Sequence, residues 1–174
     1  PVQNQYGGFV YAGATMAFTT AYWVLGHYNP REIAFLGCDM SYPKSSKTHF
    51  YGTGTADPLR EDITLISLEA KAARLYALAL AQGCEITNLS QETSRLIAPR
   101  RSLLEPRPEP FEIDKVQKAH ALAREQELAY YVASGRYWEE LERFDIEQIK
   151  RLDALWSTVV IAPPQGVVAP MRSH

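Results

Sequence analysis

Cysteine is scarce in this chain of 174 residues, which contains only Cys38 and Cys84. Two cysteines cannot build a framework of several disulfides, and their spacing does not match a metal-binding motif. Both lie in apolar or strand-like surroundings. We therefore expect buried free thiols and a reducing, cytoplasmic compartment, and the sequence does not fit the class of small disulfide-stapled domains.

Long apolar runs and an excess of one charge are also lacking. No apolar stretch reaches the roughly 18 residues that a membrane-spanning helix needs, and no basic leader precedes an apolar segment in the first twenty residues, so no secretory signal is predicted. The formal net charge is −2, which gives no basic field for nucleic acid, so we expect no nucleic-acid partner. Peripheral membrane contact stays open, because it requires neither feature.

The apolar pattern predicts helices that alternate with buried strands. We expect a helix that is apolar almost all round at residues 15–26 and a continuous buried strand at 32–40. A second helix at 65–82, which ends at Gly83, leads into a second strand at 84–89. This order is typical of an open parallel sheet. The predicted fold class is therefore α/β, with a partial Rossmann-like parallel sheet and a C-terminal helical extension.

The second half of the chain has a different composition. Residues 95–110 are rich in proline and arginine and predict an extended connector. Helices are expected at 115–131 and 137–156, and residues 158–162 read as an edge strand or as part of the tail. The chain then divides into a half-domain, a proline-rich connector, a helical extension and a flexible tail, at residues 1–104, 105–114, 115–162 and 163–174.

His49 is the most informative single residue. It lies in a loop predicted at residues 41–62, directly after the first strand, with threonine, tyrosine and two glycines around it. Ligands of α/β sheets bind beyond the carboxyl ends of the strands, and histidine exchanges a proton near neutral pH. The alternative is a loop histidine that bonds a neighbouring carbonyl.

Polar residues also follow the two predicted strands. Asp39, at the end of the first strand, would hold a ribose or a metal, or would cap the next turn through its carboxylate. Asn88 and Ser90 would contact a ligand at the end of the second strand, or would simply stop that strand. The arginines of the connector would meet a phosphate or an anionic membrane, or would remain solvated.

Four segments together resemble a known family. Residues 31–42, an apolar strand that ends in Gly-x-Asp followed by an aromatic residue, resemble the corresponding strand and loop of bacterial CMP-sialic acid-dependent sialyltransferases (glycosyltransferase family 42) and of the related 6-hydroxymethylpterin diphosphokinase-like family. Residues 48–52 look like the Ser-His-Tyr-x-Gly segment of the sialyltransferases, and residues 83–90 with 94–96 look like their next strand and its tail. The resemblance covers about residues 13–104 and corresponds to the C-terminal half of that Rossmann-like unit.

The resemblance implies roles for three residues. His49 falls on the catalytic base, which takes the proton of the acceptor hydroxyl, and Tyr42 falls near a tyrosine that bonds the leaving phosphate. Gly13 matches a glycine that approaches the donor, although Tyr11 and Ala12 replace the serines that precede it in the family. The implied function is sugar transfer from a CMP-type nucleotide donor to a bacterial surface glycan, with no cofactor and no metal site.

Two other functions remain open. A diphosphotransferase-like enzyme would require Mg²⁺ and would use Asp39. A non-catalytic fragment or assembly module is also consistent with a partial Rossmann-like unit. Because a partial sheet exposes a strand edge and an apolar face, we expect the chain to form homo-oligomers.

Overall fold

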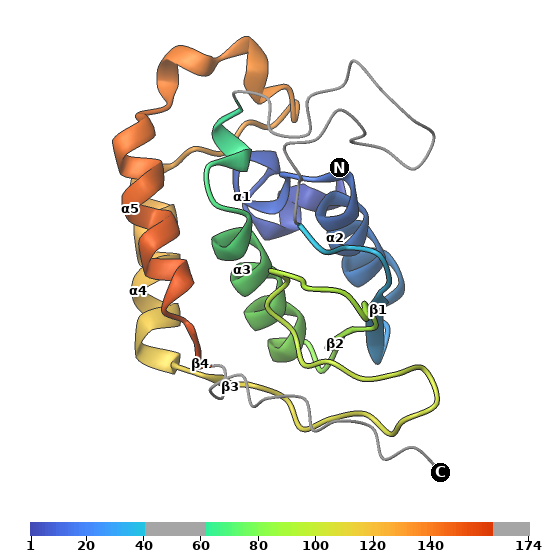
Figure 1. Ribbon diagram of the computed structural model, residues 1–174. Helices are drawn as coiled ribbons and strands as arrows, with labels where there is room; N and C mark the ends of the chain where they lie inside the picture. Colours follow the sequence, from blue (N-terminus) through green and yellow to red (C-terminus); the bar gives the residue numbers. More distant parts are fainter. Residues whose placement is uncertain (41–61, 162–174) are drawn as a thin grey trace.

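Helix α3 lies at the centre of the molecule (Figure 1). The computed structural model describes residues 1–40 and 62–161. On one side of α3 lie α2 and a pair of strands, and α4 and α5 lie on the other side. The bounds are Met16–Tyr28 for α2, Glu32–Phe35 for β1, Leu68–Ala81 for α3, Glu85–Asn88 for β2, Lys115–Leu128 for α4 and Ile146–Ser157 for α5. The predicted α/β class is confirmed as a mixed arrangement of helices around a parallel pair of strands.

Strands β1 and β2 form the parallel pair, in a register that sets Glu32 opposite Glu85 and Phe35 opposite Asn88. Both strands were expected, but β1 ends at Phe35 and not at Met40. The chain bends at the next two residues, where Gly37 has a φ of 69°. Glycine adopts a positive φ easily, and a positive φ is not compatible with the extended backbone of a strand. The longer strand predicted from the apolar run is therefore wrong at its end.

The two edges of this pair differ. The segment after β2 returns beside it, where the Asn88 N–H donates to the Pro99 carbonyl at 2.8 Å and the Arg101 N–H donates to the Asn88 carbonyl at 3.2 Å. On the far side of β1, no other described residue pairs with the strand. Within the described parts of the chain, β1 is thus the open edge of the sheet.

Each longer helix begins at a residue whose side chain accepts backbone N–H groups. Thr15 caps α2, Ser67 caps α3, Asp114 caps α4 and Asp145 caps α5. Such caps satisfy amides that have no partner inside the helix. They explain why α2, α3 and α4 start close to the positions that the sequence predicted.

The helix predicted at residues 137–156 is wrong over nearly its first half. Two short 3₁₀ turns, Tyr137–Glu139 and Leu141–Arg143, come first, and α5 starts only at Ile146. The Asp145 carboxylate accepts the N–H groups of the next helix, while its own N–H donates to the Tyr130 hydroxyl at 3.0 Å. These contacts fix an extended residue before α5 and prevent one continuous helix.

Both ends of the described chain carry short elements. At the start of the chain, Val2–Tyr6 forms a 3₁₀ helix, η1, and Phe9–Ala12 forms the short helix α1. Strand β4 (Val160–Ile161) pairs antiparallel with β3 (Glu112–Ile113) in a separate two-stranded sheet, so of the two alternatives given for residues 158–162 the strand applies at these two residues.

Helix α3 contributes to two apolar cores. Leu75 and Tyr76 pack with α2 and the sheet, whereas Ala70 and Ala77 pack with α1, α4 and α5. A helix covered on both sides buries the charges that face its neighbours, which on α3 are Lys71 and Arg74. In the described part of the chain, no helix is both long enough and apolar enough to cross a membrane.

Candidate functional site

The carboxyl edge of the parallel pair brings several segments together. Met16, at the start of α2, and Leu36, directly after β1, line the same shallow surface hollow. The Arg95 N–H, after β2, donates to the Asp39 carbonyl at 2.8 Å, and the Arg95 side chain donates to Glu69, in the first turn of α3, at 2.6 Å. Two helix N-termini and two strand ends therefore meet at this edge.

Asn88 organises the turn that follows β2. Its side chain is fully buried; its Oδ1 accepts the Ser90 N–H at 2.9 Å, and its Nδ2 donates to the Ser94 hydroxyl at 3.1 Å. That hydroxyl donates in turn to the Cys38 carbonyl at 3.4 Å. Because both polar atoms of the amide are engaged inside the protein, Asn88 positions its neighbours and has little capacity left for a ligand.

Ser90 does have capacity to bind. The residue is only 6% exposed, and its hydroxyl has no hydrogen-bond partner among the described residues. A buried polar atom without a partner costs about 1–3 kcal/mol. Among the predicted ligand-binding residues that the structure describes, Ser90 is therefore the one whose side chain a polar ligand atom would satisfy.

The other predicted site residues have different settings. Asp39 lies at the same edge as Ser90. Gly13 lies between α1 and α2, where a Cβ atom would collide with the Phe9 carbonyl oxygen, so close backbone packing alone requires glycine there. His49 and Tyr42 lie outside the described residues.

The arginines near the connector bond to carboxylates of the sheet and of α3. Arg101 reaches Glu32 of β1 at 2.8 Å, and Arg107 reaches Glu85 of β2 at 3.3 Å. Burial alone would raise the pKa of Glu32, but hydrogen bonds from Arg101 and Thr87 outweigh it and hold that pKa below its ordinary value. These ion pairs tie the connector to the sheet.

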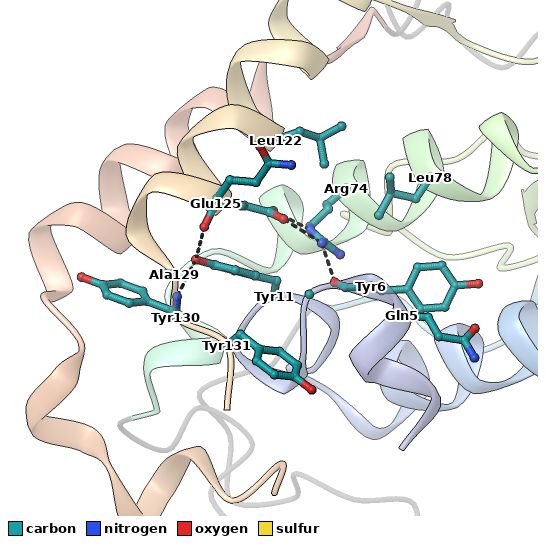
Figure 2. Close-up of a pocket in the computed structure, with 12 residues that line it drawn as sticks. Gln5, Tyr6, Tyr11, Arg74, Leu78, Leu122, Glu125, Ala129, Tyr130 and Tyr131 are labelled. Carbon is teal, nitrogen blue, oxygen red and sulfur yellow. Dashed lines mark hydrogen bonds and ion pairs between the residues drawn. The ribbon is translucent and has the colours of Figure 1, made fainter. Parts of the chain in front are cut away.

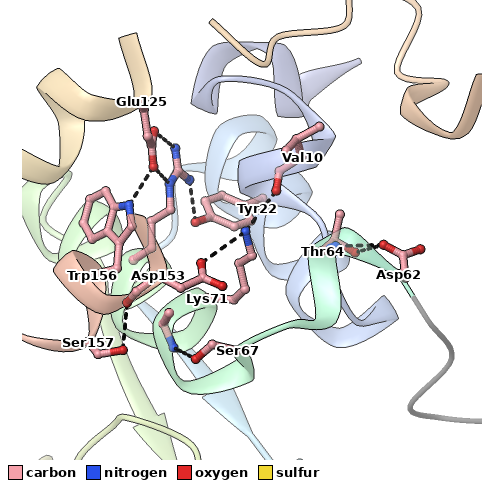
Figure 3. A network of polar contacts seen from close by, with 12 residues as sticks. Val10, Tyr22, Asp62, Thr64, Ser67, Lys71, Glu125, Asp153, Trp156 and Ser157 are labelled. Atoms are coloured by element: carbon pink, nitrogen blue, oxygen red, sulfur yellow. Dashed lines mark hydrogen bonds and ion pairs between the residues drawn. The ribbon is translucent and has the colours of Figure 1, made fainter. Parts of the chain in front are cut away.

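A second polar centre lies in the core between α3 and α4 (Figure 3). The Arg74 guanidinium donates to both carboxylate oxygens of Glu125, at 2.6 and 2.8 Å, and also to the Tyr22 hydroxyl and the Tyr6 carbonyl. Trp156 of α5 donates its indole N–H to Glu125 at 2.7 Å. Burial would lower the pKa of Arg74, but the adjacent Glu125 side chain outweighs burial and raises it, so Arg74 stays charged.

Lys71 and Asp153 form a looser pair in the same core. The Lys71 ammonium donates to the Val10 carbonyl at 3.0 Å and lies 3.8 Å from the Asp153 carboxylate. Burial lowers the pKa of Lys71 and raises the pKa of Asp153. Both shifts disfavour the charged forms, in contrast to the closely bonded pair of Arg74.

A pocket of about 450 Å³ opens beside Arg74 and Glu125 (Figure 2). Its lining comes from η1, α1, α3, α4 and the residues that follow α4, and it includes Tyr6, Tyr11, Leu78, Leu122 and Tyr131. Tyr11 is held in place because its hydroxyl donates to the Glu125 carbonyl at 3.1 Å and accepts the Tyr130 N–H at 3.3 Å. Burial raises the pKa of Tyr11 to about 12.

This buried polar centre was not predicted from the sequence. The sequence does contain a feature that indicates it, because Lys71 and Arg74 lie three residues apart on a helix made mostly of alanine and leucine. Charges within such a helix face a core when both sides of the helix are covered, and each then needs a partner.

Comparison of the chain with protein-family models, curated proteins and solved structures gives no match. Over residues 1–40 and 62–161, no three or more His, Cys, Asp or Glu side chains gather in a group that could hold a metal ion.

Proposed function

We propose that this chain is a sialyltransferase-like glycosyltransferase with a partial Rossmann-like fold, which binds a CMP-type donor at the carboxyl edge of β1 and β2. The observation that supports it is the buried, unpartnered hydroxyl of Ser90 at this edge. Open α/β sheets bind their ligands at the carboxyl ends of strands. The family resemblance points to the same edge, since the His49 segment follows β1 in the sequence.

The chemistry of this edge suits a departing phosphate. Helix N-termini, here those of α2 and α3, favour negative charge because their first N–H groups point outward. The Ser90 hydroxyl would donate a hydrogen bond to the phosphate, as would Tyr42 by the family resemblance. Hydroxyl donors placed where negative charge develops lower the barrier. His49 would take the proton of the acceptor hydroxyl, a contribution of typically about 10²–10⁴-fold.

Calorimetric titration with CMP tests the donor site. A hydrogen bond to a charged group contributes about 1.5–3 kcal/mol, so Ser90→Ala should bind CMP at least tenfold more weakly than the unaltered chain. Ser134→Ala, which changes an exposed serine near the 3₁₀ turns, is the matched control and should bind normally. Equal binding by the two variants would contradict the proposed site.

A transfer assay with a CMP-linked sugar tests the base separately. His49→Ala should lose about 100-fold or more of the transfer rate, while its affinity for CMP stays the same. A His49→Ala protein that transfers sugar at the normal rate would exclude His49 as the base, whatever the result for Ser90.

A second candidate function is that of an assembly module, which the open edge of β1 favours. Apolar side chains close to this open side of β1 are strongly exposed, with Met16 at 80% and Leu36 at 77%. Such an edge pairs readily with another strand. Light scattering should find a dimer that Leu36→Lys dissociates. Leu104→Lys, at a residue that is 96% exposed just before the connector, should leave the dimer intact. A monomer at ~100 µM, a concentration above the Kd of typical specific interfaces, would contradict this candidate.

A further inference from the structure

The pocket beside Arg74 has the size and the walls of a small-molecule site. Its volume of about 450 Å³ falls within the roughly 300–1,000 Å³ of ligand pockets. Tyrosine and leucine side chains from separate segments form its walls, and Figure 2 shows Tyr6, Tyr11 and Tyr131 on one side and Leu78 and Leu122 on the other. Aromatic walls of this kind stack well against flat rings.

The floor of the pocket carries one positive and one negative side chain, whose charges balance. Arg74 and Glu125 are the only charged residues among the twelve that line the pocket, and they bond each other through two contacts. Glu125 also accepts from Trp156, and Arg74 also donates to the Tyr6 carbonyl. An anionic ligand would have to displace Glu125, and a cationic ligand would have to displace Arg74. Either exchange leaves a buried charge without its partner, which is strongly unfavourable.

The walls of the pocket are fixed in place, and its opening carries uncharged polar groups, as suits a neutral molecule. The Tyr6 hydroxyl donates to Gln82 at 3.0 Å, and Tyr11 makes the two bonds described above, so neither ring is free to turn into the pocket. Pre-organised walls reduce the ordering that binding requires. Gln5 and Gln126 line the pocket from exposed positions, and their amides both donate and accept hydrogen bonds without adding charge.

We infer that this pocket binds a neutral, planar aromatic molecule, with the ring between the tyrosine and leucine walls and its polar edge toward the glutamines. The site is separate from the carboxyl edge of the sheet, because none of its lining residues belongs to β1, β2 or the turn after β2. The inference therefore stands whether or not the chain transfers sugar.

Three fluorescent probes of one shape test the selection for charge. We would titrate the full chain at pH 7 with neutral 2-naphthol, anionic 2-naphthoate and cationic 2-naphthylmethylammonium, and follow the fluorescence anisotropy of each probe. The neutral probe should bind at least tenfold more tightly than either charged probe. Equal affinity for all three, or no binding of 2-naphthol, would overturn the inference.

Variants then locate the binding. Leu122→Trp on α4 should fill the pocket and weaken 2-naphthol binding at least tenfold, whereas Val116→Trp, at an exposed position of the same helix, should not. Should Leu122→Trp fail to fold, Tyr131→Ala removes one exposed wall and should weaken binding severalfold. Its control is Trp138→Ala, an exposed aromatic residue outside the pocket. Unchanged binding in the folded pocket variants would also overturn the inference.

Discussion

Replacing Glu125 with glutamine would remove the counter-charge of Arg74 and keep the shape of the side chain. Both residues are buried, and the carboxylate accepts two hydrogen bonds from the guanidinium and one from Trp156. Removing one partner of a buried ion pair costs about 3–5 kcal/mol, because the other charge is left uncompensated. In a chain of this size, that loss lowers the melting temperature by roughly 6–20 °C.

The assay is urea unfolding of three variants beside the unaltered chain. Glu127→Gln on the same helix is the matched control, because Glu127 pairs with Arg124 at the surface, where such pairs contribute only about 0–1 kcal/mol. The double variant Arg74→Met/Glu125→Leu removes both charges and should be more stable than Glu125→Gln alone. If Glu125→Gln lowered the free energy of unfolding by no more than Glu127→Gln, compensation of the buried charge of Arg74 by the Glu125 carboxylate would be refuted.

Three further predictions concern the described residues. Burial raises the pKa of Asp153, so the stability of the unaltered chain should decline as the pH rises from about 4, the pKa of Asp153 in the unfolded chain, through its higher pKa in the folded chain. Urea unfolding at several pH values should find no such decline for Asp153→Asn. Parallel pH profiles of the variant and the unaltered chain would contradict this prediction. Burial raises the pKa of the Cys84 thiol from 9.0 to about 11, which leaves roughly 100-fold less thiolate; mass spectrometry at pH 8 should find this thiol resistant to iodoacetamide until the chain unfolds, and rapid labelling of the native chain would disprove the burial. Asp145→Ala should lower the free energy of unfolding by about 0.5–2 kcal/mol through loss of the α5 cap, and an unchanged thermal midpoint would show that the cap has no effect.

The main elements around the sheet could be predicted because local signals agree there. A continuous apolar run forms β1, an alanine-rich stripe forms α3, and Gly83, with a φ of 76°, ends that helix. The parallel pairing of β1 with β2 follows from this order of elements. The end of β1 was missed because an apolar pattern does not register the bend at Gly37.

The start of α5 was missed for a related reason. The apolar residues between 137 and 156 fit a helical period, but Asp145 is a strong cap that competes with helix continuation. Phe144, just before it, packs edge-on against Tyr130, with the ring centroids 5.2 Å apart. Tertiary contacts of this kind are not contained in a local pattern.

For the candidate site, the sequence could predict the relative position only of residues that are close together in the chain, at the carboxyl end of β2. Asn88 and Ser90 lie two residues apart at the end of β2, so their joint position follows from the strand. Arg74 and Glu125 lie 51 residues apart; the apolar neighbours of Arg74 indicate a buried charge, but nothing in the sequence indicates that Glu125 is its partner. Their pairing depends on how α3 and α4 pack, which periodicity does not specify.

The bonds of Arg74 also have a consequence for folding cooperativity. One guanidinium contacts η1 through Tyr6, α2 through Tyr22 and α4 through Glu125, and that carboxylate extends the link to α5 through Trp156. None of these segments can detach without leaving a buried donor or charge unsatisfied. Cutting the chain at residue 104 would separate Arg74 from Glu125 and Trp156. The N-terminal part prepared alone would then lack its central contacts, so binding experiments on the sheet need the helices as well.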